Sequence, residues 1–147
     1  MMVKNKKMNM FKEVLREYGN EHLFEKTEQN LLVGRVTLKD KGKTSVLIIM
    51  NLDDEIFDNT IEIVIKDIDL QKKYKALELV NELSQKYKNG NYYLWESQNG
   101  TLSFWRRDVY TASLDDFKPE YFNLILLRAL NDIEKDDIVE IMRLVWA

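Results

Sequence analysis

The stretch NYYLWESQNGTLSFWRRDVY, residues 91–110, restricts the fold more than any other part of the sequence. Two runs that alternate between apolar and polar side chains flank the pair Asn99-Gly100, and this pattern is the strongest short-range signal of a β-hairpin. We therefore predict two antiparallel strands with Asn99 and Gly100 as the turn. This register pairs Trp95 with Phe104, Leu94 with Trp105, Tyr93 with Arg106 and Tyr92 with Arg107.

In that register the hairpin has two apolar faces. One carries Tyr93, Trp95, Leu102, Phe104 and Arg106, and the other carries Tyr92, Leu94, Trp105, Arg107 and Val109. Water-facing strands rarely carry such side chains, so each face needs a cover, from a helix of the chain or from another chain. Tyr, Trp and Arg are enriched at interface hot spots. The second face is thus our candidate partner-binding site, and the alternative is coverage by the chain's own C-terminal helix.

Helical spacing of Met8, Phe11, Leu15 and Tyr18 predicts a first helix over residues 8–24, with Gly19 as a possible end. The seven residues before it, which include three lysines, are expected to form a flexible, solvated terminus.

Three strands are expected next, because the period changes to two. The runs NLLVGRVTLKD and KTSVLIIMNL are joined by Lys41-Gly42, a plausible tight turn. In TIEIVIKDI, Ile61, Ile63 and Ile65 alternate with other residues, which indicates a strand with one buried face.

A second helix is predicted after Asp69, a good N-cap, and before Asn89-Gly90, which would supply a left-handed helix end. Its expected apolar stripe consists of Leu70, Tyr74, Leu77, Val80, Leu83 and Tyr87.

The C-terminal part predicts further helix. Ser113 with Asp116 and then Pro119 mark a helix start. The segment YFNLILLRALNDI is apolar nearly all round, EKDD interrupts it, and DIVEIMRLVWA resumes it. We expect two helices or one kinked helix, with Asp136 or Asp137 as a possible cap of the second.

Together these elements predict a single α+β domain over residues 1–147, with a layered, antiparallel five-stranded sheet. The expected order is α-β-β-β-α-β-β-α, with a possible extra C-terminal helix. Hairpin-length connections favour this arrangement over the crossovers of a parallel sheet.

Composition narrows the functional classes. The 147 residues include 22 basic and 25 acidic side chains, a net charge of −3, which argues against a nucleic-acid binder and gives no reason to expect a membrane partner. There is no cysteine, so disulfides, thiol catalysis and thiolate metal sites are excluded. No apolar run has the length of a signal peptide or a membrane span, so a cytoplasmic location is expected.

The order of these elements, and the turn and cap residues between them, resemble those of the bacterial sensory-transduction-regulator family, whose fold is that of the type III secretion chaperones. The residue match lies between Leu77 and Ser113, where a leucine-rich helix, a basic aromatic turn with glycine, a hairpin and a small-residue helix entry follow one another. The residues in corresponding places are Lys86, Tyr87, Gly90, Tyr93, Asn99, Gly100, Leu102 and Phe104. The resemblance implies a cytoplasmic, non-enzymatic binding or adaptor domain, often dimeric, whose relatives in secretion systems hold segments of other proteins.

Other candidate sites have simpler explanations. The acidic loop with Asp53, Asp54, Glu55 and Asp58 lacks the ligand spacing and central glycine of a calcium loop, so we expect no metal site there. Asp115 with Asp116 suits a helix entry better than acid–base catalysis, and His22 has no visible catalytic partner. Phosphate-binding and serine-nucleophile motifs are absent, and no cofactor is expected.

The sequence therefore predicts a non-enzymatic protein-binding domain, adaptor-like, chaperone-like or regulatory, that acts as a homodimer or on another protein. An immunity or antitoxin protein that blocks a toxin is one alternative. A small-ligand enzyme that uses carboxylates is another, and a closed pocket with two carboxyl groups of raised pKa would support it.

Overall fold

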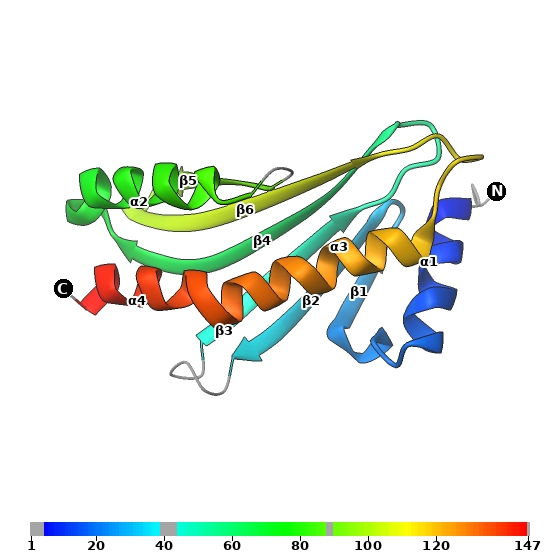
Figure 1. The fold of residues 1–147 in the computed structure, drawn as a ribbon, viewed down its shortest axis with the longest axis horizontal. Helices are drawn as coiled ribbons and strands as arrows, with labels where there is room; N and C mark the ends of the chain where they lie inside the picture. Colours follow the sequence, from blue (N-terminus) through cyan, green and yellow to red (C-terminus); the bar gives the residue numbers. More distant parts are fainter. Residues whose placement is uncertain (1–4, 39–43, 88–89, 147) are drawn as a thin grey trace.

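The computed structural model describes residues 5–38, 44–87 and 90–146. They form a six-stranded antiparallel sheet in the order β1-β2-β3-β4-β6-β5, with helices packed on one of its faces (Figure 1). The strands are β1 (Phe24–Glu28), β2 (Leu31–Leu38), β3 (Thr44–Asn51), β4 (Asp58–Asp69), β5 (Gly90–Glu96) and β6 (Thr101–Thr111). The α-helices are α1 (Lys6–Glu17), α2 (Lys73–Gln85), α3 (Pro119–Asp132) and α4 (Ile138–Trp146). The α+β class and the antiparallel sheet are confirmed, whereas the prediction of five strands is wrong.

The additional strand, β1, lies where the first helix was expected to continue. Helix α1 ends at Glu17, and Gly19 follows it in the left-handed region with φ of 69°. The amide of Asn20 donates to the carbonyl of Leu15 at 2.8 Å, the bond that closes a Schellman helix end. A 3₁₀ turn (Glu21–Leu23) then leads into β1, so Gly19 is the true end of the helix.

At its other end, α1 begins earlier than expected. Lys7 lies inside the helix and is fully buried, and its Nζ donates to the carbonyls of Ile56 and Ala112 at 2.7 and 2.9 Å. Its long aliphatic stem and two carbonyl partners make this burial possible, although burial lowers the pKa of the amine. The prediction of a flexible terminus is therefore wrong for residues 5–7, and residues 1–4 lie outside the described part.

The alternation in the central strands is confirmed. Ile61, Ile63 and Ile65 of β4 are at most 2% exposed, and β2 pairs with β3 in register from Leu31↔Asn51 to Leu38↔Thr44. The expected turn at Lys41-Gly42 lies outside the described residues.

The predicted apolar stripe of α2 is wrong in its first half. Tyr74 is 82% exposed and Leu77 is 45% exposed, whereas Ala76, Leu79 and Leu83 are buried. Steps of three residues turn an α-helix by only about 300°, so a stripe built on such steps drifts around the helix. Asp69 does act as a cap, by accepting a hydrogen bond from the Gln71 amide, but the capped element is the 3₁₀ turn Leu70–Lys72 that precedes α2.

Gly90 does not end that helix in the left-handed conformation; it is the first residue of β5. A Cβ at Gly90 would lie 2.7 Å from Asp108 Oδ1 and 3.2 Å from the Arg106 guanidinium. Close packing against a charged pair is thus the reason for glycine at this position.

The β5–β6 hairpin is present, but its register differs by one residue from the prediction. The Gly100 amide donates to the Ser97 carbonyl and the Ser97 amide donates to the Thr101 carbonyl, so the turn spans Ser97–Gly100, with Gly100 at φ of 82°. A glycine in this position gives a type I turn with a bulge, whereas a two-residue turn was assumed. The extra turn residue shifts β5 by one position, and Tyr93 now pairs with Trp105.

The C-terminal residues form one helical run that contains a π-turn. Pro119 is the first residue of α3, as expected, whereas Ser113 and Asp116 bond to each other in the turn before it. The π-turn spans Ile133–Asp137 and leads directly into α4. A kinked helix was one of the two expectations, but Asp137 does not cap α4, because it is fully buried inside the π-turn.

Candidate functional site

The corrected register decides which side chains of the hairpin share a face. Tyr92 and Phe104 are 4% and 0% exposed and belong to the core under the helices. Trp105, one residue further along β6, projects from the opposite face. We call the side of Tyr92 and Phe104 the covered face, and the side of Trp105 the open face.

An aromatic group lies on the open face. The Trp105 ring is 5.9 Å from the ring of Tyr93 and 6.4 Å from the ring of Trp95, measured between centroids. Trp95 is 51% exposed, and none of these three side chains packs against the core. Three adjoining aromatic rings thus lie on a face that no described helix covers, and Trp95 is the most exposed of them.

This aromatic group continues into an apolar strip across the sheet. On strands β4, β3 and β2, the open-face positions next to Trp105 are held by aliphatic side chains that are partly exposed and lie outside the core. The apolar members of the open face are Leu31, Val33, Leu47, Ile49, Val64, Tyr93, Trp95, Trp105 and Val109.

The charged residues of the open face include Arg107 and Glu62, which lie beside the aromatic group, and Asp58 and Asp69 near the two ends of β4. Arg107 Nε is 3.9 Å from Glu62 Oε1, and the Tyr93 hydroxyl donates to the same carboxylate oxygen at 3.4 Å. Burial, together with the negative charge of Glu62, raises the pKa of Tyr93 to about 12. Arg35 is exposed on the same face. The open face therefore combines an apolar strip with polar residues and with charged groups of both signs.

The predicted site is divided between the two faces. Trp105, Arg107 and Val109 lie on the open face, and Val109 is 39% exposed. Tyr92 and Leu94 lie on the covered face, so the prediction that they border the same surface is wrong. Tyr93 and Trp95 take their places, because the one-residue shift exchanges the faces of β5.

The covered face holds a second notable group, which we call the buried ion cluster: Arg106, Asp108, Asp132, Asp137, Tyr87 and Tyr92. Arg106 is 3% exposed, and its Nε and Nη2 donate to the two carboxylate oxygens of Asp108 at 3.0 and 3.3 Å. Asp132 accepts from Nη2 at 3.4 Å, and Asp137 Oδ2 is 3.7 Å from Nη1. Burial raises the pKa of Asp108, and the bonds from Arg106 offset part of that rise.

Two tyrosines complete the cluster. The Tyr92 hydroxyl donates to Asp137 Oδ2 at 2.5 Å, and the Tyr87 hydroxyl donates to the same carboxylate at 2.8 Å. The Arg106 guanidinium also stacks on the Tyr87 ring, 4.1 Å from its centroid. Burial, with the nearby Asp137 charge, raises the pKa of both phenols far above the ordinary value. The two phenols thus stay protonated donors to a buried carboxylate.

Position in the fold explains why the sequence did not reveal this cluster. Asp137 belongs to the segment EKDD, whose pattern predicts a run of solvated charges. The π-turn instead places the Asp137 side chain inside the protein. One signal was present: Arg106 alternates in phase with Leu102 and Phe104, so a charge at this core position requires buried acidic partners.

The polar groups of the cluster are bonded largely to one another. Asp108 is bonded to Arg106, and Asp137 is bonded to the two phenols and to Lys86. The groove beside α3 and the small hollow beside residues 54–57 are lined by other residues. Among the described residues, no group of three or more His, Asp or Glu side chains is placed to hold a metal ion.

The remaining candidates have local roles. Asp54 accepts hydrogen bonds from the amides of Lys6 and Lys7 at 2.9 Å, so this part of the acidic loop serves the N-terminus of α1. Asp53 accepts from the Glu55 amide within the loop. His22, Asp115 and Asp116 are exposed.

Within the described ranges, none of the helices combines the length and the apolar character needed to cross a bilayer. In comparisons with protein-family models, with curated proteins and with solved structures, nothing matches this chain. The resemblance to the sensory-transduction regulators therefore stays a prediction.

Proposed function

We propose that this chain is a non-enzymatic protein-binding domain and that it forms a homodimer through the open face. The observation that carries the proposal is the unbroken apolar strip from Leu31 on β2 to Trp95 on β5, on a face that no described helix covers. Large exposed apolar patches of this kind mark contact surfaces.

Size and charge favour a second copy as the occupant. Five strands spaced about 4.8 Å apart and about 25 Å long present a projected area of roughly 500–600 Å², and side-chain relief adds to it. A stable dimer buries roughly 800 Å² on each chain. In a two-fold contact, the same patch of each copy faces that of the other. Arg107 of one copy and Glu62 of the other therefore lie in the same interface. The binding role agrees with what the family resemblance implies.

The test is sedimentation equilibrium of the wild-type protein and of Trp105→Ala, beside Tyr74→Ala as a control. Tyr74 is an exposed aromatic residue on α2, away from the open face. We expect the wild type and the control to sediment at twice 17.6 kDa. Trp105→Ala should weaken association about 30-fold or more, as expected for a hot-spot residue that contributes about 2 kcal/mol.

Val109→Lys provides a second variant in case Trp105→Ala perturbs the fold. It adds a charge at an exposed position of the open face and leaves the aromatic rings in place. Circular dichroism should show an unchanged fold and sedimentation should show a monomer. A wild type that stays monomeric at about 100 μM, or a Val109→Lys dimer of unchanged affinity, overturns the proposal.

A further inference from the structure

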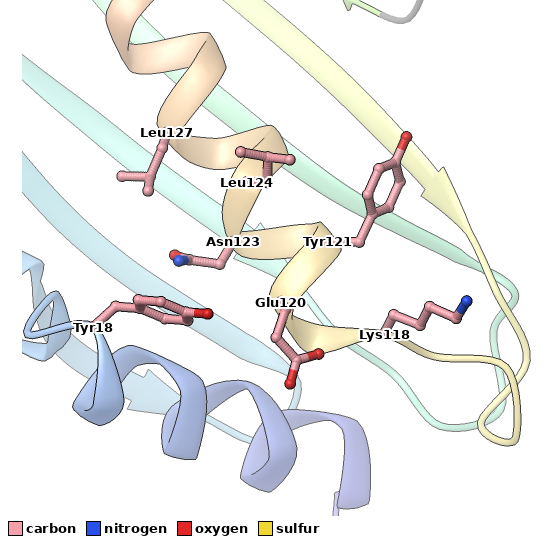
Figure 2. A pocket seen from close by; sticks show the side chains of 7 residues that line it. All are labelled: Tyr18, Lys118, Glu120, Tyr121, Asn123, Leu124 and Leu127. Carbon is pink, nitrogen blue, oxygen red and sulfur yellow. The ribbon is translucent and has the colours of Figure 1, made fainter.

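A groove lies between the end of α1 and the outer side of α3, apart from the open face. Its volume is about 470 Å³, and its lining consists of Tyr18, Lys118, Glu120, Tyr121, Asn123, Leu124 and Leu127. Four of these are large apolar or aromatic side chains that are 39–59% exposed. Figure 2 shows Asn123 and Leu127 projecting from α3 toward the side on which Tyr18 lies.

Asn123 is the unusual member of this lining. It is only 3% exposed, and within the described part of the chain its Oδ1 is buried without a hydrogen-bond partner. A buried carbonyl oxygen without a partner typically costs about 1–3 kcal/mol. Phe122 and Leu126, its neighbours on the inner side of α3, are fully buried apolar residues. A leucine would suit this position better than an asparagine if packing were the only requirement.

We infer that the groove binds an extended peptide segment of another protein, with Asn123 bonding to its backbone and an apolar side chain lying between Tyr18 and Leu127. A carboxamide has one acceptor oxygen and a donor NH₂ group, which is the complement of the N–H and C=O of a peptide unit. Because Oδ1 is itself buried in the free protein, the Asn123 side chain turns toward the groove on binding, and Oδ1 then accepts the peptide N–H.

Shape and charge support a peptide over a compact small molecule. All of its lining side chains except Asn123 are exposed, so the groove is open to solvent and does not enclose a ligand. Lys118, the N-cap residue of α3, and Glu120, in the first turn of that helix, lie at one end of the groove. Their opposite charges suit a polar backbone or a mixed sequence and give no preference for a strongly anionic or cationic ligand. This binding site does not depend on the proposed dimer, because the groove lies on the helical side of the sheet.

The test is an NMR titration of the ¹⁵N-labelled protein with the blocked tripeptide acetyl-Ala-Leu-Ala-amide. We expect shifts of the Asn123 side-chain amide and of groove residues, with a dissociation constant in the millimolar range. Asn123→Leu should bind about three- to tenfold more weakly, which corresponds to the loss of one neutral hydrogen bond. The same variant should unfold at an equal or higher urea concentration, because it removes an unpartnered buried oxygen.

Two controls keep the outcome decisive. Leu127→Ser changes an exposed side chain and should weaken peptide binding while the fold is retained. A peptide N-methylated at its leucine should bind as weakly to the wild type as the parent peptide binds to Asn123→Leu. Unperturbed groove resonances at saturating peptide, equal binding by Asn123→Leu, or a strong loss of stability in that variant would each overturn the inference. Failure of dimerisation in Trp105→Ala leaves this titration unchanged, so the two proposals fail separately.

Discussion

Arg106 and Arg107 are neighbours in sequence, yet they lie in opposite environments. The Arg106 side chain is 4% exposed and is held by three carboxylates and a tyrosine ring. The Arg107 side chain is 50% exposed and lies 3.9 Å from one glutamate. Strand alternation alone separates them. The comparison teaches that the covered face pairs its charges inside the protein, whereas the ion pair of the open face stays partly exposed to solvent.

Replacing each arginine by leucine should separate the two faces most clearly. We expect Arg106→Leu to lower the free energy of unfolding by about 3–5 kcal/mol, because it leaves the buried Asp108 carboxylate without its counter-charge. Arg107→Leu should change it by less than about 0.5 kcal/mol, because exposed ion pairs contribute little. Urea unfolding at a protein concentration low enough to keep the protein monomeric measures both, since dimerisation adds to apparent stability. Equal losses in the two variants would refute the assignment of the faces.

The adjacent tyrosines give the same comparison with a smaller effect. Tyr92→Phe removes a hydrogen bond to the buried Asp137 carboxylate and should cost about 1.5–3 kcal/mol. Tyr93→Phe removes a weaker bond of 3.4 Å to the partly exposed Glu62 and should cost about 0.5 kcal/mol or less. The same urea experiment applies. A Tyr93→Phe loss as large as that of Tyr92→Phe would contradict the register of the hairpin.

Alkaline titration sharpens the comparison further. Unfolded tyrosines ionise near pH 10, whereas the pKa of Tyr93 is about 12 and those of Tyr87 and Tyr92 are raised by burial. Above pH 10 the folded state therefore holds more protons than the unfolded state, so the unfolding free energy falls as the pH rises. The contribution of these raised pKa values to the free energy of unfolding is fully present below pH 10. It is lost as the pH rises toward the folded-state pKa of each phenol.

Absorbance at 295 nm, measured against pH, follows the ionised phenols. Tyr93→Phe should remove the part of the absorbance increase that is centred near pH 12. Tyr92→Phe should reduce only the absorbance increase that accompanies unfolding of the protein. If Tyr92 ionised near pH 10 in the folded protein, the buried ion cluster would not have the bonding described here.

Much of the fold could be predicted from local pattern, because alternation and capping depend on near neighbours. The β4 isoleucines, the position of the hairpin and Pro119 at the start of α3 are examples. Gly19 shows the limit of this approach: the sequence offers it as a possible helix end without deciding, and the left-handed backbone at Gly19 fixes the end of α1.

The candidate site was predicted less well, for two physical reasons. An Asn-Gly pair suits two turn types that differ by one residue, and that one residue exchanged Tyr92 and Leu94 for Tyr93 and Trp95. The buried ion cluster depends on contacts across long sequence separations, such as Arg106 with Asp137, and charge patterns within a segment do not report such contacts.

The central claim, that the open face meets the open face of a second copy, is tested most directly by spin labels on single cysteines. The chain has no cysteine of its own, so Ser45→Cys on the open face and Glu78→Cys on α2 each provide one label site. Packed sheets lie about 10 Å apart, with a helical layer a further roughly 10 Å outward on each side. Pulsed dipolar spectroscopy should therefore give a shorter inter-subunit distance for Ser45→Cys than for Glu78→Cys. No dipolar coupling in either sample, or a shorter distance for Glu78→Cys, would contradict the account.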